Sequence, residues 1–343
     1  MKRKSKDLYE KICSFENLHR AYLKARKGKR YKDEILRFGC HQEEFLLQLR
    51  EELLNETYRH GAYKEFIVCD SKKRHIKAAP FRDRIVHHAF CSIIEPIFDK
   101  GFIYDSYACR KGKGTRAAVL RLKKFLRSAY DSEKGNVMGG YALKCDISKY
   151  FDNVDHLILT DLLEKKIGDE RVMRLAKMIV ESTCTHSGKG IPIGNLTSQL
   201  FANVYLNEVD QFVKHTLKKK HYLRYMDDFI ILSHDKRKLA HAKLLIADFL
   251  QKNLILTPHP KKTFIHPVWK GVDFLGYVLF GDHVLLRKST VGRFIKRMKT
   301  YRSKLRRGLI AQEKIQASIV SWVSYAKHAK SWVLREKLMN REK

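Results

Sequence analysis

The segment HYLRYMDDFIIL, residues 221–232, places two adjacent carboxylates, Asp227 and Asp228, between two runs of residues that favour β-strands. The segment contains no Gly or Pro, so its natural geometry is strand, tight turn and strand, with the acidic pair at the tip. Two adjacent carboxylates repel one another unless a cation intervenes, and no Lys or Arg stands immediately beside them. The segment therefore predicts a hairpin whose tip attracts a cation.

A second acidic segment, YALKCDISKYFDNVDH at residues 141–156, comes earlier in the chain and predicts a strand that ends at Asp146. Asp146, Asp227 and Asp228 together supply the carboxylates of a two-metal phosphoryl-transfer site. In such a site, hard Mg²⁺ ions take oxygen ligands and lie about 3.5–4 Å apart. One ion would activate an attacking 3′-hydroxyl, and the other would neutralise charge on the leaving pyrophosphate. We therefore assign catalysis and metal binding to these three aspartates.

The composition points to a polyanionic partner. The 343 residues include 70 Lys and Arg against 37 Asp and Glu, a net charge of +33, which favours nucleic acid. No apolar run approaches the roughly 20 residues of a membrane span, and the N-terminus lacks the apolar core of a secretory signal. Seven cysteines without a C-x-x-C pair favour reduced thiols and no zinc site. We expect a cytoplasmic protein that does not associate with membranes.

Four regions follow from the residue patterns. Residues 1–60 predict an N-terminal helical extension, and residues 61–138 a mixed region. Residues 139–280 predict alternating strands and helices, including a helical motif at 190–217, and residues 281–343 a basic helical region.

Within these regions, residues 64–70 predict a short strand and residues 71–80 a loop. Residues 284–312 contain no Asp or Glu, whereas residues 292–308 contain eight Lys or Arg. Such a segment predicts a helix that packs along one apolar stripe and turns its cationic faces toward phosphates. The stripe consists of Phe294, Met298, Tyr301 and Leu305.

Several segments of the sequence, in a fixed order, resemble the motifs of one protein family. The YMDD segment, with DISKYF upstream, resembles the palm of reverse transcriptases. Further segments agree in order: AAPFRDRIVHHAF (78–90) and SYACRKGKGTRAA (106–118) resemble the two fingers motifs, GIPIGNLTSQLFANVYLNEVD (190–210) the following helix motif, and GVDFLGY (271–277) the primer-grip hairpin. The resemblance implies an α+β right-hand polymerase with fingers, a palm containing an antiparallel sheet, and a helical thumb. Its activity would be that of an RNA-directed DNA polymerase.

By resemblance, Asp146 and Asp227 are the metal-binding carboxylates, with Asp228 their neighbour at the site. The backbone carbonyl of Ile147 is a further expected ligand. The implied cofactors are two Mg²⁺ ions, with Mn²⁺ as the alternative.

The resemblance also assigns residues to the nucleotide. Phe151 would lie under the sugar, where a bulky ring excludes a 2′-hydroxyl, and Arg110 would contact the triphosphate. Arg74 and Arg82 would reach template or nucleotide, and Lys262 would donate a proton to pyrophosphate. A core aromatic remains the alternative for Phe151, and solvated charges remain the alternative for Arg74, Arg82 and Lys262.

The helix motif narrows the family. Most reverse transcriptases carry PQG where this chain has Pro192, Ile193 and Gly194, followed by NLTSQ. The combination resembles reverse transcriptases of diversity-generating retroelements, within the group II intron-like bacterial superfamily. Ile193 cannot form the hydrogen bond that an amide could, so rejection of mismatches should weaken. We expect Ile193 to contribute to misincorporation opposite template adenines.

That resemblance implies error-prone cDNA synthesis for the diversification of a target gene. The expected partners are template RNA, primer and cDNA, dNTPs and a small, basic, oligomeric accessory protein. We expect no RNase H or endonuclease segment, because the chain ends shortly after the FLGY motif. Group II intron-type, retron and phage-defence reverse transcriptases remain alternatives. A catalytically inactive RNA-binding scaffold would explain the charge but not Asp146 and the acidic pair.

Overall fold

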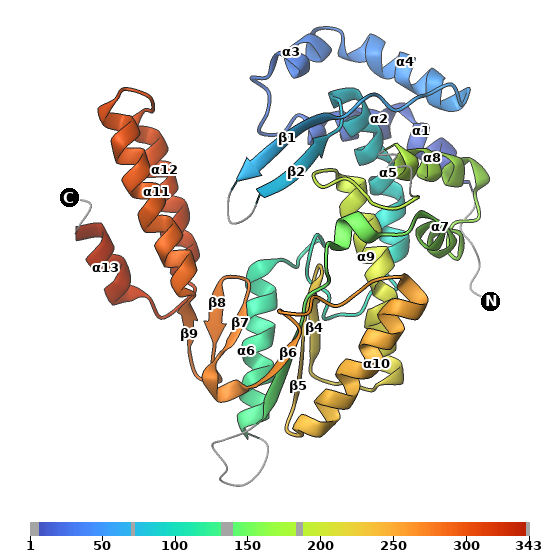
Figure 1. Cartoon of the computed structure of the whole chain (residues 1–343). Helices are drawn as coiled ribbons and strands as arrows, with labels where there is room; N and C mark the ends of the chain where they lie inside the picture. The colour runs from blue at the N-terminus through green and yellow to red at the C-terminus, as the bar shows by residue number, and fades with distance from the viewer. Residues whose placement is uncertain (1–6, 70–72, 132–139, 183–187, 341–343) are drawn as a thin grey trace.

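The computed structural model describes residues 7–69, 73–131, 140–182 and 188–340. The boundary predicted between residues 138 and 139 lies outside these ranges. Figure 1 shows a central sheet, a helical layer at the N-terminal end of the chain and a separate group of C-terminal helices. In the described part of the chain, no helix has the length and apolar character needed to cross a membrane.

The central sheet has four antiparallel strands in the order β4-β5-β3-β6. Their bounds are β3 Tyr141–Cys145, β4 Tyr222–Tyr225, β5 Asp228–Ser233 and β6 Phe264–Pro267. Side chains alternate between the two faces of a strand. Leu143, Cys145 and Phe229 therefore share one hydrophobic cluster with helices α9 (Leu196–Gln211) and α10 (Lys236–Leu254). Ala142 and Ile230 share another with α6 (Thr115–Asp131), so both faces are covered.

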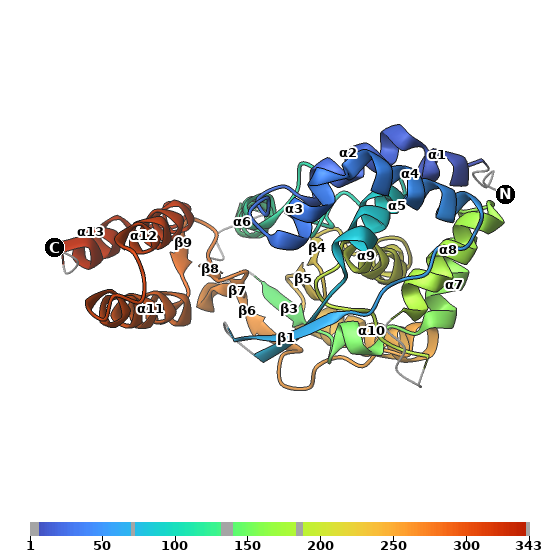
Figure 2. The same cartoon turned by 90° about the horizontal axis from the view of Figure 1, so that it is seen from above.

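The N-terminal helices pack directly on the main core. They are α1 Tyr9–Cys13, α2 Phe15–Ala25, α3 Asp33–Cys40 and α4 Gln42–Leu54. Figure 2 shows them beside α5 (Phe81–Asp99). The side-chain amide of Asn17 donates to the carbonyl of Ala89 at 3.1 Å, and the backbone N–H groups of Leu8 and Tyr9 donate to Asp169, each at 2.8 Å. The region predicted as an extension thus shares a hydrophobic cluster with the strands of the central sheet.

A two-stranded hairpin projects from this layer. Strand β1 (Lys64–Cys69) pairs with β2 (Lys73–Ala78) from Lys64↔Ala78 to Cys69↔Lys73. The predicted loop at residues 71–80 is therefore wrong over β2. Its sequence lacks apolar alternation because the hairpin buries little of either face: Phe66 and Ile67 of β1 are themselves exposed. Strand β2 is therefore stabilised mainly by backbone hydrogen bonds to β1, and burial of its side chains contributes little.

Helix α7 (His156–Glu164) packs against both α8 (Glu170–Glu181) and α9, and a 3₁₀ turn, η1 (Tyr150–Asn153), follows β3. The side chain of Asp155 accepts hydrogen bonds from the first backbone N–H groups of α7, and Asp169 does the same for α8. These N-caps explain where the two helices begin.

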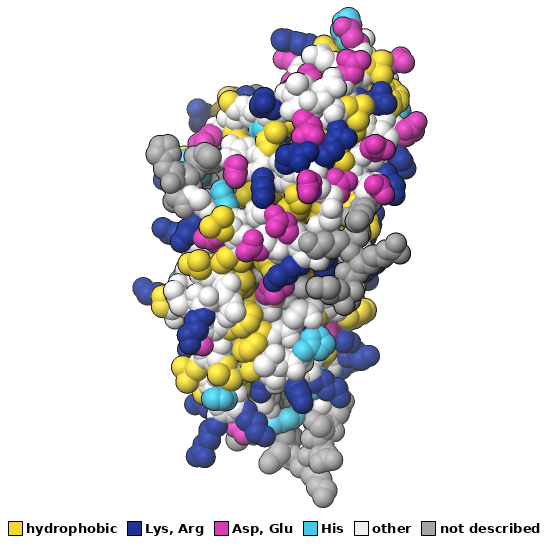
Figure 3. All heavy atoms as spheres, turned by 90° about the vertical axis from the view of Figure 1, so that its right-hand side faces the viewer, with side chains coloured by type: hydrophobic (Ala, Val, Ile, Leu, Met, Phe, Trp, Pro, Cys, Tyr) yellow, Lys and Arg dark blue, Asp and Glu magenta, His cyan; other side chains and the backbone are white. Residues whose placement is uncertain are grey.

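The C-terminal region begins with a three-stranded sheet, β7 (Val272–Phe274), β8 (Tyr277–Leu279) and β9 (Val284–Leu286), and continues into helices α11 (Lys288–Arg306), α12 (Gln312–Ala326) and α13 (Trp332–Asn340). The predicted stripe is confirmed at Phe294 and Met298, which are buried, and the Phe294 ring stacks on Trp322 at 4.1 Å. Leu305 is exposed. Acidic and basic side chains are interspersed on the face in Figure 3, whereas the acid-free segment 284–312 concentrates positive charge around α11.

Candidate active site

The β4–β5 hairpin carries the acidic pair at its tip. Tyr225 pairs with Asp228, which leaves Met226 and Asp227 as a two-residue turn. Met226 has a φ of +57°, a positive value at the first central position that is typical of a type II′ turn and is usually supplied by Gly. The predicted strand-turn-strand geometry is confirmed.

Sheet register brings the upstream aspartate to this tip. Cys145 of β3 pairs with Phe229 of β5, so the next residue along β3, Asp146, reaches the position beside Asp228. Asp146 and Asp227 both interact electrostatically with the Asp228 carboxyl. The three predicted catalytic carboxylates therefore gather at one end of the central sheet.

Two lysines neutralise the cluster. The Lys262 ammonium donates to both carboxylate oxygens of Asp146, at 2.8 and 2.9 Å. The Lys144 ammonium lies 3.6 Å from Oδ2 of Asp228. The absence of a Lys or Arg beside the pair in sequence is thus compensated by residues distant along the chain. Lys262, which the resemblance assigns to proton donation, thus contacts one of the three carboxylates.

Burial leaves Asp228 poised between its two protonation states. Burial raises the pKa of the Asp228 carboxyl to about 7, Lys144 opposes this shift, and the charges of Asp146 and Asp227 reinforce it. Its Oδ1 atom is buried and has no hydrogen-bond partner. A buried carboxylate oxygen without a donor is well suited to a cation.

The oxygen donors present fit a hard divalent ion, and the orphaned Oδ1 of Asp228 supports this fit. Within residues 7–69, 73–131, 140–182 and 188–340, no group of three or more His, Cys, Asp or Glu side chains is arranged ready to hold a metal. The ammonium of Lys262 donates to both oxygens of Asp146, one of the expected ligands. Ile147, whose carbonyl is an expected ligand, lies opposite Pro258 in a β-bridge. The residues on either side of Ile147 make its hydrogen bonds: the N–H of Ser148 donates to the carbonyl of Thr257, and the carbonyl of Asp146 accepts from the N–H of His259.

A buried arginine supports the turn, and sequence reasoning missed it. Arg224 and Asp210 are both fully buried and form a bidentate pair at 2.7 and 2.8 Å. The Arg224 guanidinium also donates to the carbonyl of Met226 at 3.1 Å, to Asn203 at 3.2 Å and to Ser106 at 3.2 Å. It thereby ties the turn to α9 and to the segment before α6. An arginine inside an apolar strand, two residues before the turn, was the available signal.

The residues predicted to contact the sugar and base lie near one loop. The backbone carbonyl of Phe151, in η1, accepts from the N–H of Ile191 at 2.9 Å. The carbonyl of Ile193 accepts from the N–H of Lys77 on β2 at 3.2 Å, and Gly194 adopts a φ of +126°. The loop before α9 therefore bridges η1 and the projecting hairpin.

The three predicted arginines differ in their surroundings. The Nε of Arg110 donates to Asp99 at 2.6 Å and its Nη1 donates to two backbone carbonyls, and its side chain is 9% exposed. Arg82 pairs with Glu52, and Arg74 is exposed on β2. Arg110 and Arg82 thus make structural contacts that the sequence did not predict, and of the three only Arg74 belongs to the exposed residues.

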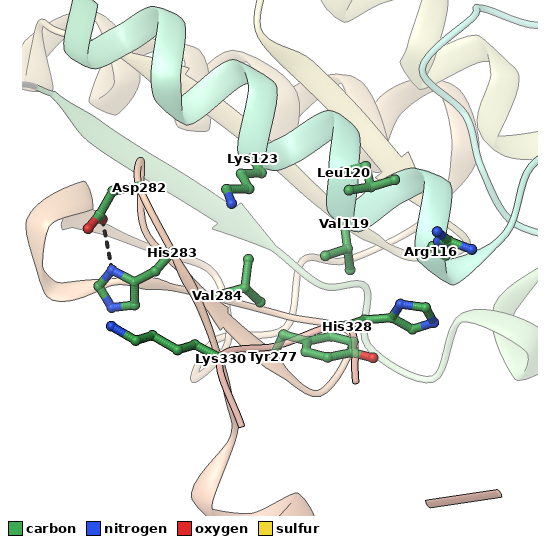
Figure 4. A pocket seen from close by; sticks show the side chains of 10 residues that line it. All are labelled: Arg116, Val119, Leu120, Lys123, Tyr277, Asp282, His283, Val284, His328 and Lys330. Atoms are coloured by element: carbon green, nitrogen blue, oxygen red, sulfur yellow. Dashed lines mark hydrogen bonds and ion pairs between the residues drawn. The ribbon is translucent and has the colours of Figure 1, made fainter. Parts of the chain in front are cut away.

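A separate cavity of about 350 Å³ lies between α6, the β8–β9 turn and the segment that joins α12 to α13 (Figure 4). Basic side chains dominate its polar lining, and His283 pairs with Asp282 at 2.8 Å. Asp146, Asp227 and Asp228 do not line it. The lining residues are Arg116, Val119, Leu120, Lys123, Tyr277, Asp282, His283, Val284, His328 and Lys330.

Several known proteins are similar to this chain. Protein YkfC of Escherichia coli (strain K12) is 27% identical over 280 residues, covering 70% of this chain and 71% of YkfC. The group II intron-encoded protein LtrA of Lactococcus lactis subsp. cremoris is 27% identical over 180 residues, covering 50% of this chain and 28% of LtrA. Nuclear intron maturase 2 of Arabidopsis thaliana is 29% identical over 152 residues, covering 39% of this chain and 19% of the maturase. The chain thus spans less than a third of each of these two longer relatives.

Among solved structures, apo telomerase from Candida tropicalis superposes with a TM-score of 0.51 at 12% identity, covering 69% of this chain and 50% of the telomerase. This likeness concerns the mixed helix-and-sheet fold alone. The family model described as reverse transcriptase (RNA-dependent DNA polymerase) matches residues 64–279, more than half of the chain, and includes the three gathered aspartates. The chain belongs to the reverse transcriptase family.

Proposed function

We propose that the chain is an RNA-directed DNA polymerase that extends a primer by two-metal nucleotidyl transfer at Asp146, Asp227 and Asp228. The observation that carries this proposal is the antiparallel register that brings Asp146 beside the Met226–Asp227 turn. A catalytically inactive scaffold would have no need for three carboxylates gathered at one sheet end, with one oxygen buried and unpartnered.

The arrangement supports a right-hand layout. The central sheet with α9 and α10 would form the palm, β1–β2 with α5 the fingers, and α11–α13 the thumb. In Figure 1 the β1–β2 hairpin lies above the central sheet, and the C-terminal helices stand apart from it on the left. The β7–β8 hairpin would be the primer grip, and the acid-free helix α11 would face phosphates.

Asp146, Asp227, Asp228 and the carbonyl of Ile147 would hold the divalent ions, which when bound activate the 3′-hydroxyl and neutralise phosphate charge. The ammonium of Lys262 pairs with the carboxylate of Asp146. Its side chain is 36% exposed, so it has room to turn from the carboxylate toward the pyrophosphate and donate a proton there.

Primer extension on an RNA template tests this proposal. Asp146→Ala and Asp227→Ala should each abolish Mg²⁺-dependent dNTP incorporation. Asp248→Ala is the matched control, because Asp248 is exposed on α10 and pairs with Lys252 four residues away. Incorporation by either catalytic variant at the rate of the control would overturn the assignment.

We further propose that the product is adenine-mutagenic cDNA of a diversity-generating retroelement. The support is Ile193, an aliphatic residue in the loop that contacts β2 of the projecting hairpin. Partners would be the retroelement template RNA and a small basic accessory protein. The intron-encoded relatives are compatible with the alternative, a group II intron-like reverse transcriptase.

Sequencing of cDNA made from an adenine-containing template separates these readings. Wild-type cDNA should carry errors concentrated opposite adenine, and Ile193→Gln should reduce them because an amide restores a hydrogen-bonding group. Leu244→Gln, on an exposed position of α10, is the control. Accurate wild-type cDNA would favour the group II intron-like alternative, and an unchanged error spectrum in Ile193→Gln would exclude this residue from fidelity.

A further inference from the structure

The side chain of Lys144 lies beside the proposed catalytic carboxylates. It lies on β3 two residues before Asp146, so both side chains project from the same face of the sheet. Ala142, on that same face, belongs to the hydrophobic cluster that contains Val272 and Phe274 of the primer-grip strand β7. Lys144 therefore lies between this strand and the catalytic end of the sheet. Its side chain is only 12% exposed.

The Lys144 ammonium joins two elements. It donates to the backbone carbonyl of Asp273 on β7 at 2.8 Å and lies 3.5 Å from the Asp273 carboxylate. It also lies 3.6 Å from Oδ2 of Asp228 on β5. The contact with a main-chain carbonyl matters most, because it holds the backbone of β7 in place as well as one side chain.

The connection continues to the thumb. The carboxylate of Asp273 also pairs with the guanidinium of Arg287, the residue that precedes α11. The backbone N–H of Arg287 donates to the carbonyl of Gly276 at 3.0 Å. Negative and positive side chains thus alternate along one connection. It runs from Asp228 on β5 through Lys144 on β3 and Asp273 on β7 to Arg287, which precedes α11.

We propose that Lys144 is a positioning residue that holds the primer grip, and through it the base of the thumb, in register with the catalytic carboxylates. The inference rests on the proposed function, since it concerns where a primer 3′ end lies. Reaction requires the 3′-oxygen and the phosphorus to approach within about 3–3.5 Å, and misplacement by about 1 Å costs on the order of 100-fold in rate. An ion pair that is largely buried is weak evidence for stability, so we assign this connection a role in geometry.

The test measures single-turnover extension of an annealed primer on RNA at saturating Mg²⁺ and dNTP, with primer-template affinity from fluorescence anisotropy. Lys144→Met, similar in length but uncharged, should lower the extension rate about 10-fold to 100-fold. The dNTP KM should change much less than kcat. Lys144→Arg should retain most of the rate, because its guanidinium reaches the same oxygens. The control is Lys252→Met, an equal charge change at a side chain that is 72% exposed on α10.

A double-mutant cycle tests whether the connection acts as a unit. Asp273→Asn alone should slow extension, and Lys144→Met/Asp273→Asn should be no more than about 2-fold slower than Lys144→Met. Fully additive effects would overturn the proposal. So would recovery of the Lys144→Met rate when Mg²⁺ is raised above the concentration that saturates the wild type, because Lys144 would then act only on metal binding.

One further variant covers the case in which Lys144→Met does not fold, and the activity of the wild type separates failure of the proposed function from failure of this inference. Should Lys144→Met fail to fold in thermal melting, Arg287→Gln, at the partly exposed end of the connection, must show the rate loss instead. An inactive wild-type protein would refute the proposed function. An active wild type with Lys144→Met at the rate of Lys252→Met would refute this inference alone.

Discussion

Replacing Arg224 by Met should destabilise the protein far more than the loss of an exposed ion pair. Arg224 and Asp210 have fully buried side chains and contact each other at 2.7 Å. Met fills a comparable volume but leaves the Asp210 carboxylate buried without its guanidinium. Among the residues that the structure describes, only the hydroxyl of Tyr222 still donates to it, at 2.6 Å. Breaking a buried pair from one side costs roughly 3–5 kcal/mol.

The assay is thermal unfolding, followed by circular dichroism, of Arg224→Met and a matched control. Arg174→Met is suitable, because Arg174 makes a bidentate pair with Glu56 but is 53% exposed. An exposed pair contributes about 0–1 kcal/mol, so the control should melt close to wild type. Arg224→Met should melt on the order of 10 °C lower. The double variant Arg224→Met/Asp210→Leu should regain part of this loss, since no buried charge is left unpaired.

Equal melting temperatures for Arg224→Met and Arg174→Met would refute the reasoning. A double variant less stable than Arg224→Met would also contradict it, because the cost would then not come from an unpaired Asp210. Any Arg224→Met protein that folds should extend primers poorly, since the carbonyl of Met226 loses the donor that holds the turn.

Two further predictions concern the metal site. Because burial raises the pKa of Asp228 to about 7 from an ordinary 3.8, its contribution to the stability of the metal-free protein should fall as pH rises from 3.8 and level off above 7. Mg²⁺ binding needs the ionised carboxylate, so affinity measured by calorimetry should rise as pH increases through about 7, and Asp228→Asn should flatten that rise. Lys262→Met should tighten Mg²⁺ binding about 10-fold without nucleotide, because the ammonium no longer competes for Asp146. Unchanged or weaker binding would contradict this competition.

The β1–β2 hairpin shows why part of the fold escaped prediction. Periodic apolar residues identified the helices and the central strands, because burial imposes that pattern. Strand β2 has charged or polar residues at most positions and is held by pairing with β1. A strand that buries little of either face carries no periodic signal, so its sequence predicts a loop.

By itself, the sequence determined the local chemistry: β-formers around two carboxylates specify a hairpin, and an acid-free amphipathic segment specifies a basic helix. Only the tertiary structure decided the partners of those groups. The register of the sheet places Lys144 beside Asp228, and a loop distant in sequence places Lys262 beside Asp146. The carboxylate of Asp99 pairs with the guanidinium of Arg110. Ion pairs depend on distances between elements far apart in the chain. The position of a residue along a strand or helix sets the face from which its side chain projects, whereas the tertiary fold sets which residues contact that side chain.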